Sequence, residues 1–128
     1  MKDNISDDKT ILVIDDSTTN VVLLEAILND KGYRINTALN VKEAFQLMSK
    51  QLPDLILLDL LMPKINGYEF LKDIKSRDDM KEIPVIVISA VTDAENIKKT
   101  MNLGAIDFIK KPVDIQNLIT RVSETLEN

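Results

Sequence analysis

The chain contains no cysteine, no histidine and no tryptophan. Without cysteine it can form no disulfide, thiolate metal site or thiol nucleophile. Without histidine it has neither a Ser-His-Asp triad nor an imidazole ligand for a metal. Any chemistry must therefore come from carboxylates, amines and hydroxyl groups.

Composition also argues against several classes of protein. No apolar run approaches the roughly 18 residues that a membrane-spanning helix needs, and the polar, acidic segment 1–9 does not resemble a signal peptide. The net charge is −5, and the lysines are scattered among acidic residues rather than gathered in a basic stripe, which argues against nucleic-acid binding. We therefore expect a cytoplasmic protein with no direct nucleic-acid or membrane partner.

With 128 residues, of which 45% are hydrophobic, the chain is long enough to bury one core. Short β-branched runs without helical period alternate with stretches that have apolar residues at i, i+3 and i+4. The expected strands are residues 10–14, 33–37, 55–58, 85–88 and 106–109, and apolar residues within 21–28, 41–48, 68–74, 97–103 and 115–126 mark the expected helices. We expect one domain over residues 1–128, with its core over about 9–126.

Local signals support the helices and the sheet. Asn40, Asn66 and Thr92 each precede a glutamate by three residues, which is the spacing of a capping box or its asparagine analogue. The nearly continuous hydrophobic runs are typical of parallel strands that helices cover on both faces. The predicted fold class is therefore α/β, a flavodoxin-like, doubly wound (βα)5 arrangement with a five-stranded parallel sheet in the order 2-1-3-4-5.

Ligands of such sheets bind at the carboxyl ends of the strands, where the winding reverses. In this strand order the point lies between the first strand, which runs into Asp15 and Asp16, and the third, which runs into Asp59. Three carboxylates so close together repel one another, which raises a pKa or requires a cation. Oxygen ligands without nitrogen or sulfur favour Mg²⁺ or Mn²⁺. We therefore expect a metal-dependent phosphate site.

Two further strand ends add complementary groups. Ser89 would supply a hydroxyl after the fourth strand, and Lys110 and Lys111 would supply positive charge after the fifth. Taken singly, an aspartate here is commonly a charge at a helix N-terminus, a serine a loop hydroxyl and a lysine a solvated surface charge. Their convergence at one sheet edge favours a site in which an aspartate attacks phosphorus.

These motifs, in this order, closely resemble the receiver domain of bacterial two-component response regulators over about residues 9–126. The motifs that carry the resemblance are Ile11-Leu-Val-Ile-Asp15-Asp16, Asp59-Leu-Leu-Met62-Pro63, Gly67, Ser89-Ala90, Gly104-Ala105 and Phe108-Ile-Lys-Lys111-Pro112. The resemblance implies a regulatory domain of a phosphorelay rather than an enzyme, which accepts a phosphoryl group from a histidine kinase or phosphotransfer protein. The missing histidine agrees with this, because the donor histidine would lie outside this sequence.

The resemblance also implies a role for each site residue. Asp59 would be the phosphoacceptor. Asp16 and Asp59 would bind Mg²⁺ directly, together with the backbone carbonyl of Leu61. Asp15 would act mainly through water. Lys111, directly before a proline, matches the family's lysine, and its bond to that proline is expected to be cis, which would help to aim the side chain.

A two-state switch is implied as well. A phosphoryl group adds up to about two negative charges and three acceptor oxygens. Ser89 would move onto this group, and Phe108 would fill the vacated space, although spacing alone would make Phe108 an aromatic residue of an edge strand. The face formed by the fourth helix (97–103), the fifth strand (106–109) and the fifth helix (115–126) would change and dock a downstream protein or a second copy of the chain.

Three alternatives are weighed against this function. A Mg²⁺-dependent phosphohydrolase with an aspartyl nucleophile would use similar carboxylates, but haloacid-dehalogenase-type enzymes carry Asp-x-Asp on the first strand. A flavin-binding protein of this fold would be coloured, and Asp15 and Asp16 would repel the flavin phosphate. A phosphorylation-independent adaptor would not need the complete aspartate, serine and lysine set. Turnover of a chromogenic phosphate ester with release of free phosphate would favour the hydrolase.

Overall fold

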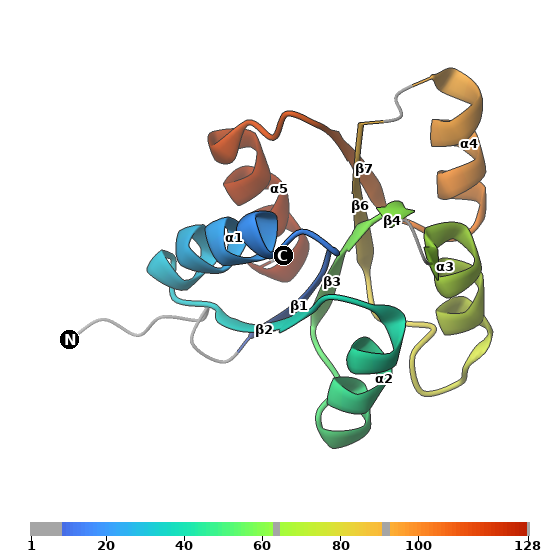
Figure 1. The fold of residues 1–128 in the computed structure, drawn as a ribbon, viewed down its shortest axis with the longest axis horizontal. Helices are drawn as coiled ribbons and strands as arrows, with labels where there is room; N and C mark the ends of the chain where they lie inside the picture. The colour runs from blue at the N-terminus through green and yellow to red at the C-terminus, as the bar shows by residue number, and fades with distance from the viewer. Residues whose placement is uncertain (1–8, 63–64, 91–92, 128) are drawn as a thin grey trace.

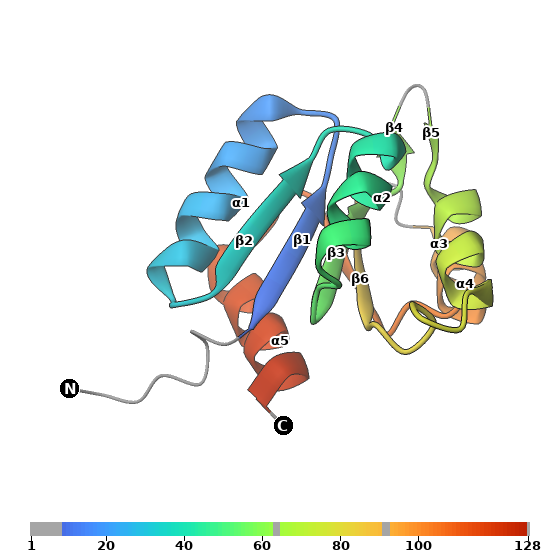
Figure 2. The same ribbon diagram turned by 90° about the horizontal axis from the view of Figure 1, so that it is seen from below.

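A five-stranded parallel sheet forms the centre of the molecule (Figures 1 and 2). The computed structural model describes residues 9–62, 65–90 and 93–127, and the sheet order within them is β2-β1-β3-β6-β7. The strands are β1 (Thr10–Ile14), β2 (Arg34–Ala38), β3 (Leu55–Asp59), β6 (Val85–Ser89) and β7 (Asp107–Lys110). Because β6 and β7 are the fourth and fifth strands of the prediction, the predicted fold class and strand order are confirmed.

Helices cover both faces of the sheet. They are α1 (Thr18–Asp30), α2 (Val41–Lys50), α3 (Gly67–Ser76), α4 (Ala94–Asn102) and α5 (Ile115–Glu127). Figure 1 shows α1 and α5 together on one side of the sheet and α2, α3 and α4 on the other. Helices α1 to α4 each return the chain to the start of the next strand of the sheet, as parallel strands require, and α5 follows the last strand.

Alternating side chains divide the core into two layers. Ile11 and Val13 of β1 pack in the layer beneath α1 and α5, whereas Leu12 and Ile14 pack in the layer beneath α2 and α3. Strands β1, β3 and β6 are buried from end to end. The continuous apolar runs in the sequence are therefore explained by a sheet that has no solvent-facing side at its centre.

Some boundaries differ from the predictions by one residue. Strands β3 and β6 extend to Asp59 and Ser89, so these two polar residues belong to the hydrogen-bonded ladder, where Asp59 pairs with Ile88 and Ser89 with Lys110. A short antiparallel hairpin of β4 (Leu61–Met62) and β5 (Ile65–Asn66) follows β3 and was not predicted. Two-residue strands are too short to show a hydrophobic period.

The predicted caps have different outcomes. Asn40 caps α2, since its Oδ1 accepts the backbone N–H of Glu43 at 2.9 Å. The prediction for α4 was wrong by one residue, because Asp93 is the cap and accepts the N–H of Asn96 at 2.8 Å. Thr92 itself lies outside the described residues, as does Pro63. Aspartate is as effective a cap as threonine, so spacing alone did not distinguish the two neighbours.

Candidate functional site

Three aspartates meet at the carboxyl edge of the sheet. Asp15 and Asp16 follow β1, and Asp59 is the last residue of β3. One carboxylate oxygen of each lies within 4.8 Å of those of the other two. Asp15 and Asp59 are 4% and 5% exposed, while Asp16 is exposed. The predicted cluster is thus assembled, with two carboxylates fixed in the protein and one facing solvent.

The start of α1 fixes the orientation of Asp15. The backbone N–H of Ser17 donates to Asp15 Oδ1 at 2.9 Å, and the Asn20 amide donates from Nδ2 to Asp15 Oδ2 at 3.3 Å. Ser17 is also the N-cap of α1, and its hydroxyl accepts the N–H of Asn20 at 3.3 Å. Sequence reasoning missed Asn20. Its place one turn after the cap, on the helix that begins at the site, is the signal that could have identified it.

Lys111 supplies the positive charge of the site. Its Nζ lies 3.2 Å from Asp59 Oδ2 and 3.8 Å from Asp15 Oδ2, so one amine bridges two of the three carboxylates. The backbone N–H of Lys111 donates to the carbonyl of Ser89 at 3.0 Å, which ties the residue to the end of β6. The bond to Pro112 is cis, as predicted. Lys110 is exposed and belongs to β7, so Lys111 is the lysine at the site.

The two predicted switch residues lie on neighbouring strands. Ser89 is fully buried at the end of β6, one residue after Ile88, which pairs with Asp59. Phe108 is half-buried on β7 and packs against the apolar layer beneath α2 and α3. The structure therefore places Ser89 on the strand that adjoins Asp59 and Phe108 on the edge strand beyond it. Their movement on phosphorylation stays a prediction.

The backbone of Leu61 begins β4, two residues after Asp59. Its place in the chain is compatible with a carbonyl directed at the carboxylates, and that role also stays a prediction. The donor set as a whole consists of carboxylate oxygens, with an amine nearby and no nitrogen or sulfur ligand available from histidine or cysteine. This donor chemistry fits a hard divalent cation, which prefers oxygen ligands.

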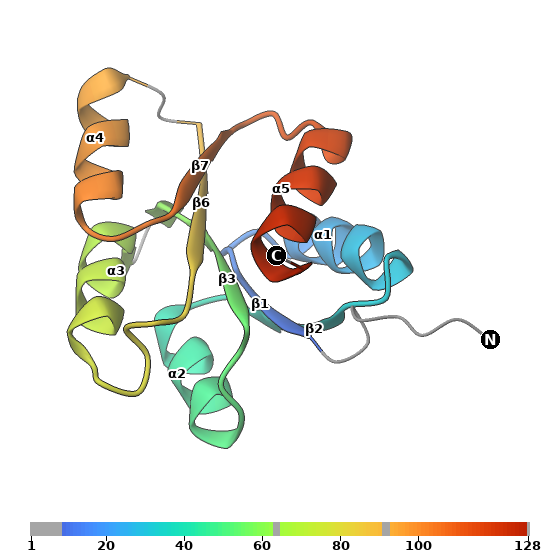
Figure 3. The same ribbon diagram turned by 180° about the vertical axis from the view of Figure 1, so that it is seen from behind.

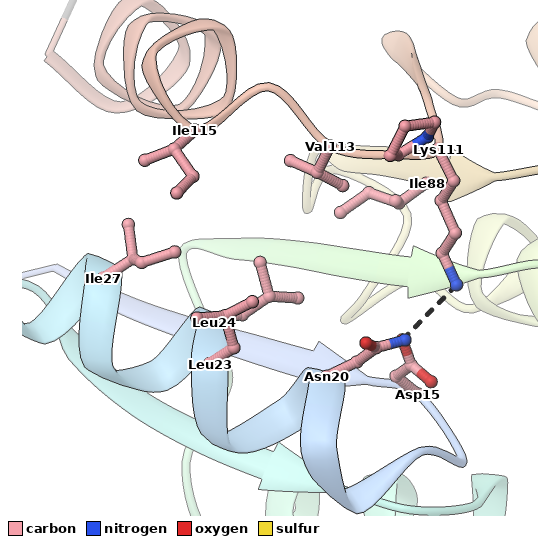
Figure 4. A pocket seen from close by; sticks show the side chains of 10 residues that line it. Asp15, Asn20, Leu23, Leu24, Ile27, Ile88, Lys111, Val113 and Ile115 are labelled. Carbon is pink, nitrogen blue, oxygen red and sulfur yellow. Dashed lines mark hydrogen bonds and ion pairs between the residues drawn. The ribbon is translucent and has the colours of Figure 1, made fainter.

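A cavity of about 300 Å³ opens beside Asp15 and Lys111 (Figure 4). Its apolar walls come from α1, from the end of β6 and from the segment that leads into α5. These wall residues are Leu23, Leu24, Ile27, Ile88, Val113 and Ile115. The charged groups thus lie at the polar end of a largely apolar groove between α1 and the start of α5.

Comparison with known proteins identifies the family. The model of the response regulator receiver domain matches residues 11–123. The chain is 37% identical over 119 residues to a Vibrio cholerae protein named "Probable cyclic di-GMP phosphodiesterase", a match that covers 93% of this chain and 27% of that protein. It is 38% identical over 112 residues to response regulator PleD of Caulobacter vibrioides, covering 88% of this chain and 25% of PleD. The chain thus spans about a quarter of the length of these two relatives.

A solved structure gives the same result. The signal receiver domain of a signal transduction histidine kinase from Syntrophus aciditrophicus superimposes with a TM-score of 0.84 and 34% sequence identity, over 93% of this chain and 90% of that one. Within the described part of this chain, no helix has the length and apolarity that crossing a membrane would demand. From its sequence match, its sheet order and its carboxylate cluster, this chain belongs to the response regulator receiver domain family.

Proposed function

We propose that this chain is a phosphoacceptor switch, which takes a phosphoryl group from a histidine kinase or a phosphotransfer protein onto Asp59. The observation that carries the proposal is the pairing of Asp59 with Lys111, at 3.2 Å, within a cluster of three carboxylates. A structural ion pair would need only one carboxylate for one lysine. The additional negative charge of Asp15 and Asp16 is explained by a site built for a divalent cation and a phosphoryl group.

In the transfer, a carboxylate oxygen of Asp59 attacks phosphorus and forms an acyl phosphate. The bond between phosphorus and the donor's imidazole nitrogen breaks, and its electron pair stays on that nitrogen. Lys111, which already lies beside the Asp59 carboxylate, would hold the phosphoryl oxygens as a point charge. The burial of Asp59 keeps the attacking group in one place, which lowers the entropy cost of the reaction.

The cation proposed for the site is Mg²⁺, with Mn²⁺ as a substitute. When bound, Mg²⁺ offsets the charge of the carboxylates and of the phosphoryl oxygens. Asp16 and Asp59 would hold it directly with the backbone carbonyl of Leu61, and Asp15 would do so through water. The hydrogen bonds from Ser17 and Asn20 to Asp15 would keep that carboxylate aimed at the cation's water shell.

The apolar groove beside Lys111 supports a protein as the donor. Leu23 and Ile115, which line it, are 52% and 49% exposed, and Val22 on the same helix is 58% exposed. A donor protein whose histidine reaches Asp59 would cover this surface, whereas a small phosphodonor would leave it in water. Exposed apolar residues beside a charged site are typical of an interaction surface.

The output is proposed to run through Ser89 and Phe108. Ser89 would move toward the phosphoryl oxygens, and Phe108 would turn inward on β7. The face of α4, β7 and α5 would then change its shape and bind a downstream protein or a second copy of the chain. In this proposal the protein is a cytoplasmic regulator, and its chemistry is limited to its own phosphorylation and dephosphorylation.

The test is phosphorylation by acetyl phosphate with Mg²⁺, read by the intact mass of the native protein. We expect the mass of one phosphoryl group to be added to the parent and not to the Asp59→Asn variant. Asp54→Asn is a matched control, because Asp54 precedes the same strand at its opposite end and accepts the N–H of Thr10 at 2.8 Å. No mass gain in the parent, or an equal gain in Asp59→Asn, would overturn the proposal.

A further inference from the structure

A polar contact joins the helix that follows Ser89 to the helix that follows Asp59. Helices α3 and α4 lie side by side in two views (Figures 1 and 3). Tyr68, in the first turn of α3, donates its hydroxyl to Asn96 Oδ1 at 2.7 Å. Asn96 donates from Nδ2 to both carboxylate oxygens of Asp93, the N-cap of α4, at 3.0 and 2.9 Å. Tyr68 is therefore linked through one side chain to the cap of α4.

The start of α3, next to Tyr68, is packed against the residue that follows the proposed phosphoacceptor. The residue before Tyr68, Gly67, is buried so closely against Leu60 that an added Cβ would lie 2.8 Å from Leu60 Cα and 3.0 Å from its carbonyl oxygen. Leu60 directly follows Asp59 in the chain. The first turn of α3 is thus fixed by the backbone next to Asp59. Through the hydroxyl of Tyr68, the position of α4 depends on the same part of the backbone.

Helix α4 depends on such contacts because it buries few apolar side chains. Of its nine residues, all within the described part of the chain, only Thr100 is buried. Lys99 of α4 adds a second contact to the same tyrosine, since its Nζ lies 4.2 Å from the centre of the Tyr68 ring. A helix with so little apolar burial is held in one position by a small number of polar contacts, each of which changes its equilibrium measurably.

We propose that Tyr68 is a positioning residue that holds the first turn of α4 against α3 and so sets how readily the domain switches. The inference rests on the proposed function, in which Ser89, four residues before Asp93, moves toward the phosphoryl group. A movement passed on to Asp93 and Asn96 pulls Asn96 away from Tyr68. The hydrogen bond therefore favours the arrangement in which the first turn of α4 lies against α3, and a ligand that prefers the arrangement with these two segments apart binds more weakly while the bond exists.

The experiment measures binding of beryllofluoride, a tetrahedral mimic of a phosphoryl group on a carboxylate, in the presence of Mg²⁺. Isothermal titration calorimetry compares the parent with Tyr68→Phe, which keeps the ring beneath Lys99 and removes only the hydroxyl. We expect Tyr68→Phe to bind about fivefold more tightly, which is the equilibrium effect of a typical hydrogen bond. Urea unfolding of the same samples verifies that each variant is folded.

The chain provides a matched control in its second tyrosine. Tyr33 donates its hydroxyl to Glu127 Oε2 at 2.7 Å, the same length as the Tyr68 bond, but joins the loop after α1 to the end of α5. Tyr33→Phe should lower the stability as much as Tyr68→Phe does and leave beryllofluoride affinity unchanged. If the Tyr68 bond had a merely structural role, both substitutions would lower the stability and neither would change the affinity for beryllofluoride.

Each outcome is decisive. Tighter binding by Tyr68→Phe alone supports the proposal, and the substitution should then add nothing in an Asn96→Ala background. Binding by Tyr68→Phe that equals or is weaker than that of the parent overturns the positioning role and leaves the proposed function in place. A parent that does not bind beryllofluoride, or Asp59→Asn that binds it equally well, overturns the proposed function and this inference with it.

Discussion

Helices α3 and α4 are neighbours on the same face of the sheet, yet they are attached to the molecule in different ways. Helix α3 buries Phe70, Leu71 and Ile74 in the core beneath it, together with Gly67 at its start. Helix α4 buries Thr100 alone among its nine described residues. The helix that follows Asp59, the proposed phosphoacceptor, is anchored by apolar packing, and the helix that follows Ser89, the proposed switch residue, is anchored by polar contacts.

This difference agrees with the proposed switch. Apolar packing is close and resists small displacements, because a shift leaves voids that lose contact energy. Polar side-chain contacts such as those of Tyr68 and Asn96 can exchange for water at a much lower net cost. If the domain switches as proposed, Asp59 must stay in place while the output face moves, and burying α3 but not α4 meets both needs. The folding of the core and the proposed movement would then be carried by separate helices.

The largest expected effect is in the core beneath α3. Leu71 is 0% exposed, so Leu71→Ala should lower the free energy of unfolding by about 2–5 kcal/mol through lost burial and the cavity left behind. Urea unfolding followed by circular dichroism measures the change. A loss below about 1 kcal/mol would mean that the site tolerates collapse, and the contrast between the two helices would disappear.

The next effect is at the cap of α4. Asp93 accepts the N–H of Asn96 and two bonds from the Asn96 side chain. Asp93→Ala should therefore lower the free energy of unfolding by about 1 kcal/mol, the usual cost of losing a cap. The same substitution at Asn40, the cap of α2, gives the matched comparison. Hydrogen exchange should show faster exchange confined to α4 in Asp93→Ala, and exchange spread over the whole chain would contradict a local effect.

The sequence allowed the sheet and the central site to be predicted because both depend on short-range patterns. The apolar runs that became β1, β3 and β6 are continuous, so their parallel order followed from general rules of chain topology. Asp15, Asp16 and Asp59 could be placed together because each follows a strand of that sheet. These predictions needed only the position of each residue within its own element.

Contacts between elements were not predictable in the same way. The bond from Asn20 to Asp15 joins a helix to a strand end, and the bond from Tyr68 to Asn96 joins two helices through residues that are 28 positions apart in sequence. The first contact has only a weak signal, the place of Asn20 one turn after the cap of α1. The second has none, because its partners are brought together by the way α3 and α4 pack and not by spacing along the chain. The shallow burial of α4 could not be predicted either. The spacing of its apolar residues predicted a helix but not how deeply that helix is buried; these residues are Ile97, Met101 and Leu103.

The smallest expected effect is at Met101, which marks the apolar side of α4 and is nonetheless 39% exposed. Met101→Ala should change the free energy of unfolding by no more than about 0.5 kcal/mol, because a side chain that keeps more than a third of its surface in water leaves no closed cavity when it is truncated. Alanine also favours the helix slightly, which offsets part of the loss. The measurement is the same urea titration used for Leu71→Ala. A loss above about 1 kcal/mol would show that α4 is held by apolar burial after all, and the assignment of its position to Tyr68, Asn96 and Lys99 would then be wrong.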